Sequence, residues 1–263
     1  MNAMDVKFVP VAPAEILPTL QQHISAFPAP IDSFLEDHIL ASQHYQITLR
    51  GQPIGWTAVH GERLLTQFAL LPGYKAWGQA IFALVRRLEE VQAAFVPTSD
   101  EYFLAHALDD YRQIEKQAYF FQHDPQRPAY QPALTLNHRQ ATAADRALIQ
   151  HHSGDFFDRV EQRLAEGQLY ITERAGQGGD SCAGFGIIDS GRLALGVASC
   201  GMFTVEAQRN QGIGPAIIAH LIARCADRGL RPIAGCWYYN HRSKKTLEKA
   251  GMFSQTRLLK ISF

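Results

Sequence analysis

Apolar and polar residues along the chain follow periods of two and of about 3.6, which predict strands joined to amphipathic helices. The clearest example is FTVEAQRNQGIGPAIIAHLIARCADRG, residues 203–229, an apolar and β-branched stretch followed by a glycine turn and a helix. Pro215 is expected at the first helical position and Gly229 just beyond the last one. One face of this predicted helix gathers Ile217, Ile218, Leu221, Ile222 and Cys225.

The same order of elements occurs twice along the chain. The matching segments are 6–24 with 134–152, 45–65 with 170–195, and 68–91 with 203–226. In the second copy Thr142 and Asp145 have the spacing of a capping box, and both copies carry a glycine followed by an aromatic residue, at Gly55 and Gly184. We interpret the chain as two copies of one fold; the alternative is that two unrelated α+β domains share this order by chance.

Prolines mark the boundary between the two copies. The segment HDPQRPAYQPAL, residues 123–134, contains three prolines, each of which lacks a backbone donor and disfavours helix before it. We therefore predict a first domain over residues 1–122, a linker over 123–133 and a second domain over 134–263.

The balance of charges limits the possible partners. Lysine plus arginine and aspartate plus glutamate both total 25, so the net charge is +0 and no broad cationic surface for nucleic acid is expected. No apolar run approaches the roughly 18 residues of a membrane span, and the amino-terminal residues lack the pattern of a signal segment. We expect a cytoplasmic protein that does not bind a membrane; its oligomeric state is not indicated.

Cysteine and histidine do not form a metal-binding pattern. The adjacent histidines, His151 and His152, lack the i, i+4 spacing of metal ligands. The four cysteines contain no C-x-x-C pair, so we predict buried thiols in a reducing compartment rather than disulfides or a zinc site. They are Cys182, Cys200, Cys225 and Cys236.

The glycine turn before the second-half helix has the character of a phosphate loop. A helix N-terminus leaves its first amides without partners, and glycines let a phosphate approach the backbone. A nucleoside triphosphate loop would need Gly-Lys-Ser/Thr, whereas this chain has Gly214-Pro215-Ala216. A dinucleotide loop would need a third glycine, which falls at Ile217, and an acidic residue that RPIAGCWYYN, residues 231–240, does not supply.

The loop and the segment after it resemble the GNAT superfamily of acetyl-coenzyme A dependent N-acetyltransferases. The family pattern Gln/Arg-x-x-Gly-x-Gly/Ala corresponds to residues 209–214, and a second motif of the family is similar to YYNHRSKKTLEKAGMF, residues 238–253. The matching positions are Arg209, Gly212, Gly214, Asn240, Ser243, Glu248, Lys249, Gly251 and Met252. The resemblance covers about residues 134–263; for the first half it rests on the internal repeat.

This resemblance implies a fold and a cofactor site. The fold is α+β, a mixed and mostly antiparallel sheet flanked by helices, here in two tandem GNAT-like domains. The first copy reads LLPGYKAWGQAI at the loop, residues 70–81, and is expected to be degenerate. By carry-over, main-chain groups of Phe203, Thr204 and Val205 bind the pantetheine and thioester, Asn240 bonds the pantetheine arm, and the loop amides hold the pyrophosphate. Those loop residues are Arg209, Asn210, Gln211, Gly212, Ile213 and Gly214.

Other roles stay open for some of these residues. The two loop glycines could serve only a tight strand-to-helix turn, and Asn240 could serve only as a helix N-cap. Many family members have a tyrosine as general acid seven residues after the asparagine, where this chain has Leu247. Tyr239 and Ser243 are catalytic candidates by proximity, and the general base is unassigned because Glu206 is expected in a loop.

The resemblance implies an N-acetyltransferase that moves an acetyl group from acetyl-coenzyme A to a primary amine by direct attack, without a metal. The alternative is a non-catalytic protein that binds acetyl-coenzyme A as a sensor or structural ligand. The acceptor amine, a small molecule or a peptide, is not identified. Acidic residues in 155–166 favour a cationic acceptor, unless they belong to a solvated helix face; they are Asp155, Asp158, Glu161 and Glu166.

Overall fold

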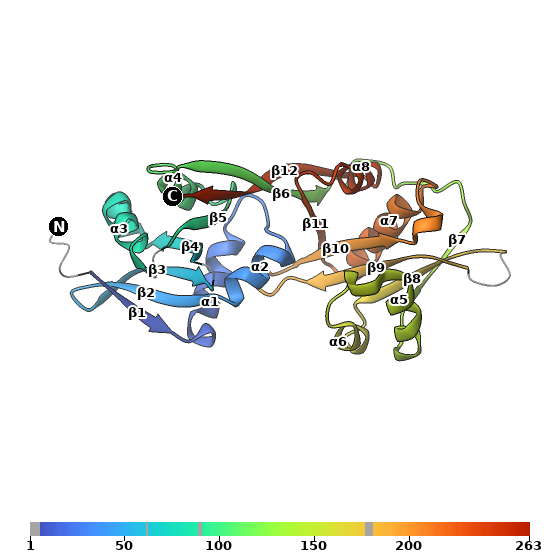
Figure 1. Cartoon of the computed structure of the whole chain (residues 1–263), viewed down its shortest axis with the longest axis horizontal. Coiled ribbons are helices and arrows are strands. Elements are labelled where there is room, and N and C mark those ends of the chain that lie inside the picture. Colours follow the sequence, from blue (N-terminus) through green and yellow to red (C-terminus); the bar gives the residue numbers. More distant parts are fainter. Residues whose placement is uncertain (1–5, 62, 89–90, 177–180) are drawn as a thin grey trace. The chain divides into compact units, whose positions relative to one another are not determined.

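The computed structural model of the chain describes residues 6–61, 63–88, 91–176 and 181–263. Contacts divide the chain into two compact units, each a sheet with helices packed against it (Figure 1). Unit 1 comprises Met1–Phe120, Arg192–Leu195 and Thr256–Phe263, and unit 2 comprises Phe121–Gly191 and Gly196–Gln255.

Unit 1 has the strand order β1-β2-β3-β4-β5-β12-β6. Neighbouring strands from β1 to β4 are antiparallel, β4 and β5 are parallel, and β12 is antiparallel to β5. The strands are β1 (Val6–Val11), β2 (Gln43–Leu49), β3 (Gln52–His60), β4 (Leu64–Leu70), β5 (Ala93–Pro97), β6 (Gln113–His123) and β12 (Met252–Ser262). The helices are α1 (Pro13–Ser25), α2 (Ser33–Leu40), the 3-10 helix η2 (Pro72–Trp77), α3 (Gly78–Val85) and α4 (Glu101–Ala107).

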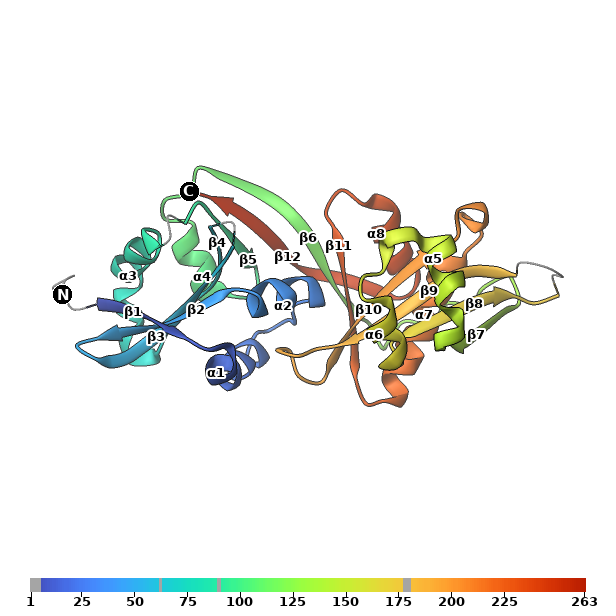
Figure 2. The same cartoon turned by 60° about the horizontal axis from the view of Figure 1, so that its bottom comes forward.

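Unit 2 repeats this arrangement. Its strands follow the order β7-β8-β9-β10-β11, with antiparallel pairs up to β10 and a parallel pair between β10 and β11. The strands are β7 (Leu136–Gln140), β8 (Leu169–Arg174), β9 (Cys182–Ser190), β10 (Val197–Thr204) and β11 (Arg231–Trp237). The helices are α5 (Arg146–Ser153), α6 (Val160–Ala165), α7 (Ile213–Asp227) and α8 (His241–Lys249), with the 3-10 helices η4 (Ala143–Asp145), η5 (Gly154–Phe156) and η6 (Glu206–Gln208). Figure 2 shows the same elements from a second direction.

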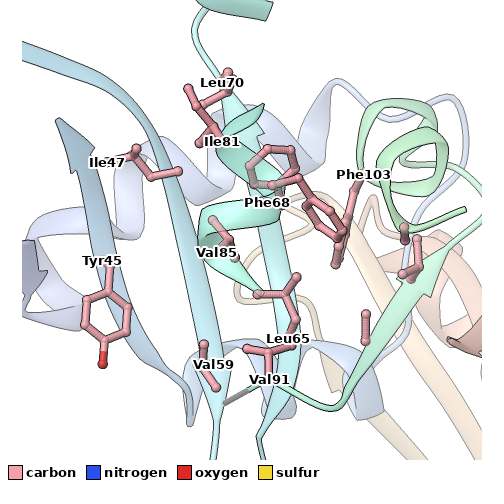
Figure 3. Packing of buried hydrophobic residues seen from close by; sticks show 14 of the residues in the cluster. Tyr45, Ile47, Val59, Leu65, Phe68, Leu70, Ile81, Val85, Val91 and Phe103 are labelled. Carbon is pink, nitrogen blue, oxygen red and sulfur yellow. The ribbon is translucent and has the colours of Figure 1, made fainter. Parts of the chain in front are cut away.

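The core of unit 1 lies between the sheet and its helices. Every residue of β4 is buried, and Ile81 and Val85 of α3 lie over Phe68 of that strand (Figure 3). The i, i+4 spacing of Ile81 and Val85 puts both on one face of the helix. Each such buried side chain contributes roughly 1.5–3 kcal/mol of transfer free energy, so this face fixes α3 on the sheet.

Two features confirm that the units are copies of one fold. Gly55 of β3 pairs with Leu70, the last residue of β4, and Gly184 of β9 pairs with Thr204, the last residue of β10. At both glycines a Cβ atom would collide with the carbonyl oxygen of the preceding residue on the neighbouring strand, Ala69 in one case and Phe203 in the other. The glycine-aromatic pair of the sequence therefore marks the same close backbone approach in each copy.

The second shared feature is a parallel strand pair that separates after its start. In unit 1 the pairing of β4 with β5 runs from Leu64↔Ala93 to Leu65↔Ala94. In unit 2 the pairing of β10 with β11 runs from Val197↔Arg231 to Ser199↔Ile233. Both copies thus have a parallel strand pair that splays apart after its first residues.

Several local predictions can be compared with the structure. The capping box of Thr142 and Asp145 is confirmed, although the turn that it starts is 3-10. Helix α7 begins at Ile213, so Pro215 is its third residue rather than the predicted first. The third residue still lies in the first turn, where an amide has no intrahelical acceptor, so a proline is tolerated there. The sequence of the second copy predicts a glycine-containing turn before the strand with Gly184, and its residues 177–180 lie outside the described residues.

The limits of the compact units differ from the predicted domain limits at three places. Unit 2 begins at Phe121, within β6, and the last residues of the chain belong to unit 1, because Leu258 to Ser262 pair with β5. Residues 192–195, between β9 and β10 in the sequence, also belong to unit 1. The predicted limits considered only the order of elements along the chain and could not assign a strand to a distant sheet.

Candidate functional site

The splay in unit 2 exposes one edge of β10. Along its other edge, β10 pairs with β9 up to Thr204↔Gly184. Among the described residues, no register pair joins β10 to β11 beyond Ser199↔Ile233. Alternate peptide groups of a strand face opposite edges, so those of Thr204 lie on this side, whereas those of Phe203 face β9, as the amide of Val205 does. The amide of Thr204 can therefore bond an extended ligand as it would bond a strand. The amide of Val205 is committed, since it donates to the carbonyl oxygen of Ala183 at 3.1 Å.

The glycine turn follows directly and has the backbone conformation of an anion-binding nest. Asn210 has φ 64° and Gly212 has φ 81°, both in the left-handed region, and α7 begins at the next residue. In the described part of the chain, no hydrogen bond uses the amides of Asn210, Gln211 or Gly212 as donors. These amides and those of the first turn of α7 form a set of donors that fits a pyrophosphate.

The two loop glycines are required for different reasons. Gly212 adopts a conformation that strains other residues, and a Cβ there would lie 2.6 Å from the hydroxyl oxygen of Tyr130. A Cβ on Gly214 would lie 3.0 Å from Thr246 Cγ2 of α8 and 3.4 Å from Thr204 Oγ1. Gly212 thus sets the turn, whereas Gly214 lets α8 approach the start of α7, so a packing role holds for the second glycine.

The side chain of Arg209 lies back over the end of β10. Its Nε donates to the carbonyl oxygen of Thr204 at 3.3 Å, its guanidinium lies 5.9 Å from the Phe203 ring, and Nη1 is 3.7 Å from Glu206. Glu206 itself lies in η6 with its side chain 90% exposed, as the sequence predicted for a loop residue. Neither the Arg209 nor the Glu206 side chain bonds the described amides of residues 210–212, so these donors stay available to a ligand.

Helix α8 holds the second motif. Asn240 is its N-cap, and Oδ1 accepts a hydrogen bond from the amide of Ser243 at 3.0 Å. The capping role considered for Asn240 is therefore present; a bond from its amide group to a pantetheine stays a prediction. Tyr239 is exposed and contacts Trp237 at the end of β11, with 5.2 Å between ring centroids. Leu247, at the position of the family tyrosine, is a buried residue of α8.

The acidic residues considered for a cationic acceptor have partners of their own. Asp158 binds Arg163 at 2.6 Å, and Glu161 binds Arg146 at 2.5 Å. Glu166, the C-cap of α6, accepts bonds from the side chains of Gln162 in α6 and of Gln168, which lies just before β8. These contacts account for most of the cluster as intramolecular ion pairs and hydrogen bonds.

Aromatic rather than acidic residues lie beside the end of β10. The ring of Phe156 is 56% exposed and lies 5.1 Å from the ring of Phe203, while the adjacent Phe157 is buried. Phe203 in turn lies 6.3 Å from Phe185 of β9. This side of β10 is apolar up to the exposed face of Phe156.

A cysteine nucleophile is not available on this strand. Cys200 of β10 is buried with its sulfur 3.6 Å from that of Cys225 in α7. The hydrogen bond to Cys225 and burial raise the pKa of the Cys200 thiol, which stays protonated at neutral pH. All four cysteines are buried, as predicted.

The corresponding turn of unit 1 has lost the nest. Residues 72–77 form the 3-10 helix η2, and among residues 70–81, all of them described, none has a positive φ. A Cβ on Gly78 would collide with the His106 ring and lie 2.5 Å from the hydroxyl of Tyr102. Side chains of α4 therefore fill the space in front of this helix start, where unit 2 presents free amides.

Sequence reasoning missed two side chains at the unit 2 loop. Tyr130, from the proline-rich segment, contacts Gly212, and Arg174 at the end of β8 donates from Nη1 to Gln208 Oε1 at 3.1 Å and to Gln211 Oε1 at 3.0 Å. Neither belongs to the loop motif. The signal for Arg174 was topological, because β8 and β10 run in the same direction and end at the same edge of the sheet.

The described residues contain neither a metal-binding cluster nor a membrane-spanning helix. Among the described residues, no group of three or more histidine, cysteine, aspartate or glutamate side chains is arranged to hold a metal ion. In the same part of the chain, no helix combines the length and the apolar composition needed to cross a bilayer.

Comparisons with known proteins agree with this fold. The model of the acetyltransferase (GNAT) family matches residues 108–252, and the model of an acetyltransferase (GNAT) domain matches residues 13–124. The chain therefore belongs to the GNAT acetyltransferase family and contains two tandem copies of its fold. This membership makes the chain an acyltransferase in general terms. A search of curated protein sequences found no match.

Solved structures of similar fold cover the whole chain. An acetyltransferase from the GNAT family of Colwellia psychrerythraea superposes with a TM-score of 0.86 at 17% identity, over 98% of this chain and 99% of that one. A GCN5-related N-acetyltransferase from Sphaerobacter thermophilus gives a TM-score of 0.66 at 13% identity, over 98% and 95%. A tandem GNAT protein from the clavulanic acid biosynthesis pathway gives 0.61 at 13% identity, over 98% of each chain. At these identities the likeness establishes the fold alone.

Proposed function

We propose that the protein is an N-acetyltransferase that transfers the acetyl group of acetyl-coenzyme A to a primary amine. The observation that carries this proposal is the continuity of two binding features in unit 2. The free edge of β10 ends at Thr204, and the nest of amides begins six residues later at Asn210. An extended thioester arm followed by a pyrophosphate has the chemistry that these two features recognise in that order.

In this proposal the chain acts by orientation and by stabilising charge. The main-chain amide of Thr204 at the free edge of β10 holds the arm, and a backbone donor near the thioester carbonyl stabilises the negative charge that develops there. The neutral acceptor amine attacks the carbonyl carbon, the C–S bond breaks, and coenzyme A leaves as the thiolate. The thiolate of coenzyme A is a tolerable leaving group at neutral pH, so transfer proceeds without a tyrosine at position 247. Tyr239 and Ser243 stay the candidates for proton transfer.

A second candidate function is a non-catalytic acetyl-coenzyme A sensor. It is favoured by the buried Leu247 at the place of the family acid and by the ion pairs that occupy Asp158 and Glu161. Both candidates need the same donor site, so ligand binding does not separate them. Only chemistry on an amine does.

Two measurements test the proposal. Calorimetry with acetyl-coenzyme A should give one site per chain, because the turn of unit 1 is a 3-10 helix without a nest. Release of free thiol from acetyl-coenzyme A, followed across a panel of primary amines, should rise above the rate without amine for at least one class. Binding with no amine-dependent thiol release would favour the sensor, and no binding would refute both functions.

A further inference from the structure

Arg174 is the last residue of β8, and its backbone is fixed on both sides. It pairs with Leu136 of β7, and its amide donates to the carbonyl oxygen of Ser181 at 2.9 Å. The guanidinium group therefore extends from a rigid strand toward the turn at 205–212, rather than from a loop that could move with its target.

This guanidinium group bonds two glutamine side chains at the phosphate loop. Nη1 donates to Gln208 Oε1 of η6 at 3.1 Å and to Gln211 Oε1 at 3.0 Å. Gln211 also donates from Nε2 to the carbonyl oxygen of Ala207 at 3.4 Å. One arginine thus holds side chains from the start and from the centre of the loop.

Gln211 lies between the two residues with left-handed backbone. Asn210, at φ 64°, and Gly212, at φ 81°, flank it, and its own amide belongs to the free donor set. A non-glycine residue in the left-handed region costs of the order of 1 kcal/mol, so the turn needs contacts that keep it in this conformation. The side chain of Gln211 supplies such a contact only while its oxygen has a fixed partner.

The partners that the described residues give the Arg174 guanidinium group are neutral amide oxygens. In the described part of the chain, no carboxylate forms an ion pair with Arg174, and the neighbouring Glu173 pairs with Arg139 at 3.3 Å. A cation with two neutral amide partners at an anion-binding turn also raises the local potential for phosphate.

We propose that Arg174 is a positioning residue of the coenzyme A site, which acts through Gln208 and Gln211 to keep the loop amides converged on the pyrophosphate. This inference rests on the proposed function. It assigns Arg174 no contact with the reacting atoms. Its effect falls on binding of the phosphate-bearing part of the donor and not on the acyl transfer step.

A double-mutant cycle tests this role in the full-length chain. The variants are Arg174→Ala, the pair Gln208→Ala with Gln211→Ala, and all three substitutions together, each measured for the Kd of coenzyme A by calorimetry. We expect about a tenfold loss of affinity in each of the three, which corresponds to about 1.4 kcal/mol. Because one set acts through the other, the combined variant should lose no more than either alone.

Steady-state kinetics separates positioning from a general loss of folded protein. Arg174→Ala should raise the KM for acetyl-coenzyme A about tenfold with kcat unchanged, whereas partial unfolding would lower kcat and the melting temperature at constant KM. Arg224→Ala is the matched control, since Arg224 is an exposed arginine in α7 and pairs with Asp227. The control should leave both KM and Kd unchanged.

Each outcome decides the matter. Unchanged affinity in Arg174→Ala, or additive losses in the combined variant, would overturn the inference. If Arg174→Ala does not fold, the two glutamine substitutions on the exposed loop still report, and an unchanged Kd in that pair overturns it. Failure of the wild-type chain to bind coenzyme A refutes the proposed function instead, so the two failures are distinguishable.

Discussion

Removal of the Glu36 carboxylate should destabilise unit 1 more than any nearby change of charge. Glu36 lies in α2, is 1% exposed, and accepts three backbone hydrogen bonds from the segment 192–194 of the same unit. Oε2 accepts from the amide of Arg192 at 2.9 Å, and Oε1 accepts from the amides of Leu193 at 3.0 Å and Ala194 at 2.6 Å. This segment joins β9 to β10 in the sequence, and β10 carries the proposed donor edge.

The expected magnitude follows from the number and burial of these bonds. A hydrogen bond to a charged group contributes about 1.5–3 kcal/mol, and an amide left buried without a partner costs about 1–3 kcal/mol. The values do not add, and loss of one partner of a buried ionic network typically costs about 3–5 kcal/mol. We therefore expect Glu36→Ala to lower the free energy of unfolding by about 3–5 kcal/mol. Glu36→Gln should cost about 2 kcal/mol, because its amide group would face the donor of Arg192.

Urea unfolding at pH 7 and hydrogen exchange at the amides of Leu193 and Ala194 provide the assay. Asp37→Asn is the matched control: Asp37 lies next in α2 and pairs with the Arg192 side chain, but both side chains are 44% exposed. Such a pair contributes about 0–1 kcal/mol. If Glu36→Ala is no less stable than Asp37→Asn and leaves exchange at 193 and 194 unchanged, the carboxylate does not hold this segment.

Two further substitutions have defined outcomes. Gly212→Ala and Gly229→Ala both place a side chain at a positive φ, and each should lower the free energy of unfolding by about 1 kcal/mol. Only the side chain in Gly212→Ala meets Tyr130, so only this variant should weaken coenzyme A binding in calorimetry. Equal affinity in the two variants would contradict the role of the turn. Burial raises the pKa of Asp32 to about 7, above its unfolded value near 3.9, so the free energy of unfolding should fall as pH rises from about 4 to 7. In Asp32→Asn the side-chain oxygen can still accept the hydrogen bond from the amide of Leu35. This variant should reduce the pH dependence of the urea midpoint measured from pH 4 to 8. If the pH dependence is the same as in the wild type, Asp32 does not titrate in this range.

The parts of the fold that the sequence predicts are local ones. The turn at 209–214 combines a glycine in the left-handed region with a helix start, and both follow from residues adjacent in the chain. The capping box of Thr142 is another local pattern that the structure confirms. The internal repeat was also within reach, because each copy keeps the same glycine beside the same neighbouring strand.

The contacts that the sequence does not predict join distant residues. Glu36 and Leu193 are 157 positions apart, and Arg174 and Gln211 are 37 apart. Neither pair has a periodicity or motif, since a single carboxylate or guanidinium group satisfies donors or acceptors wherever the fold brings them. The pairing of Leu258 to Ser262 with β5 has the same character, because an apolar strand fits more than one sheet edge.

The two copies differ in the parts of the scaffold that the proposed binding site uses. Both keep the splayed parallel strands, and both begin the following helix with the same cap: Asp100 Oδ1 accepts from the amide of Phe103 at 3.0 Å, as Asn240 Oδ1 does from Ser243. The cap of unit 1 is thus a buried carboxylate, which would repel a phosphate, whereas the cap of unit 2 is neutral. The turn before the other helix is 3-10 in one copy and left-handed at Gly212 in the other. Strand splay and helix capping are common to both units and do not distinguish them. Under the proposed function, the difference in anion binding between the units therefore depends on the backbone of one turn and the charge of one cap.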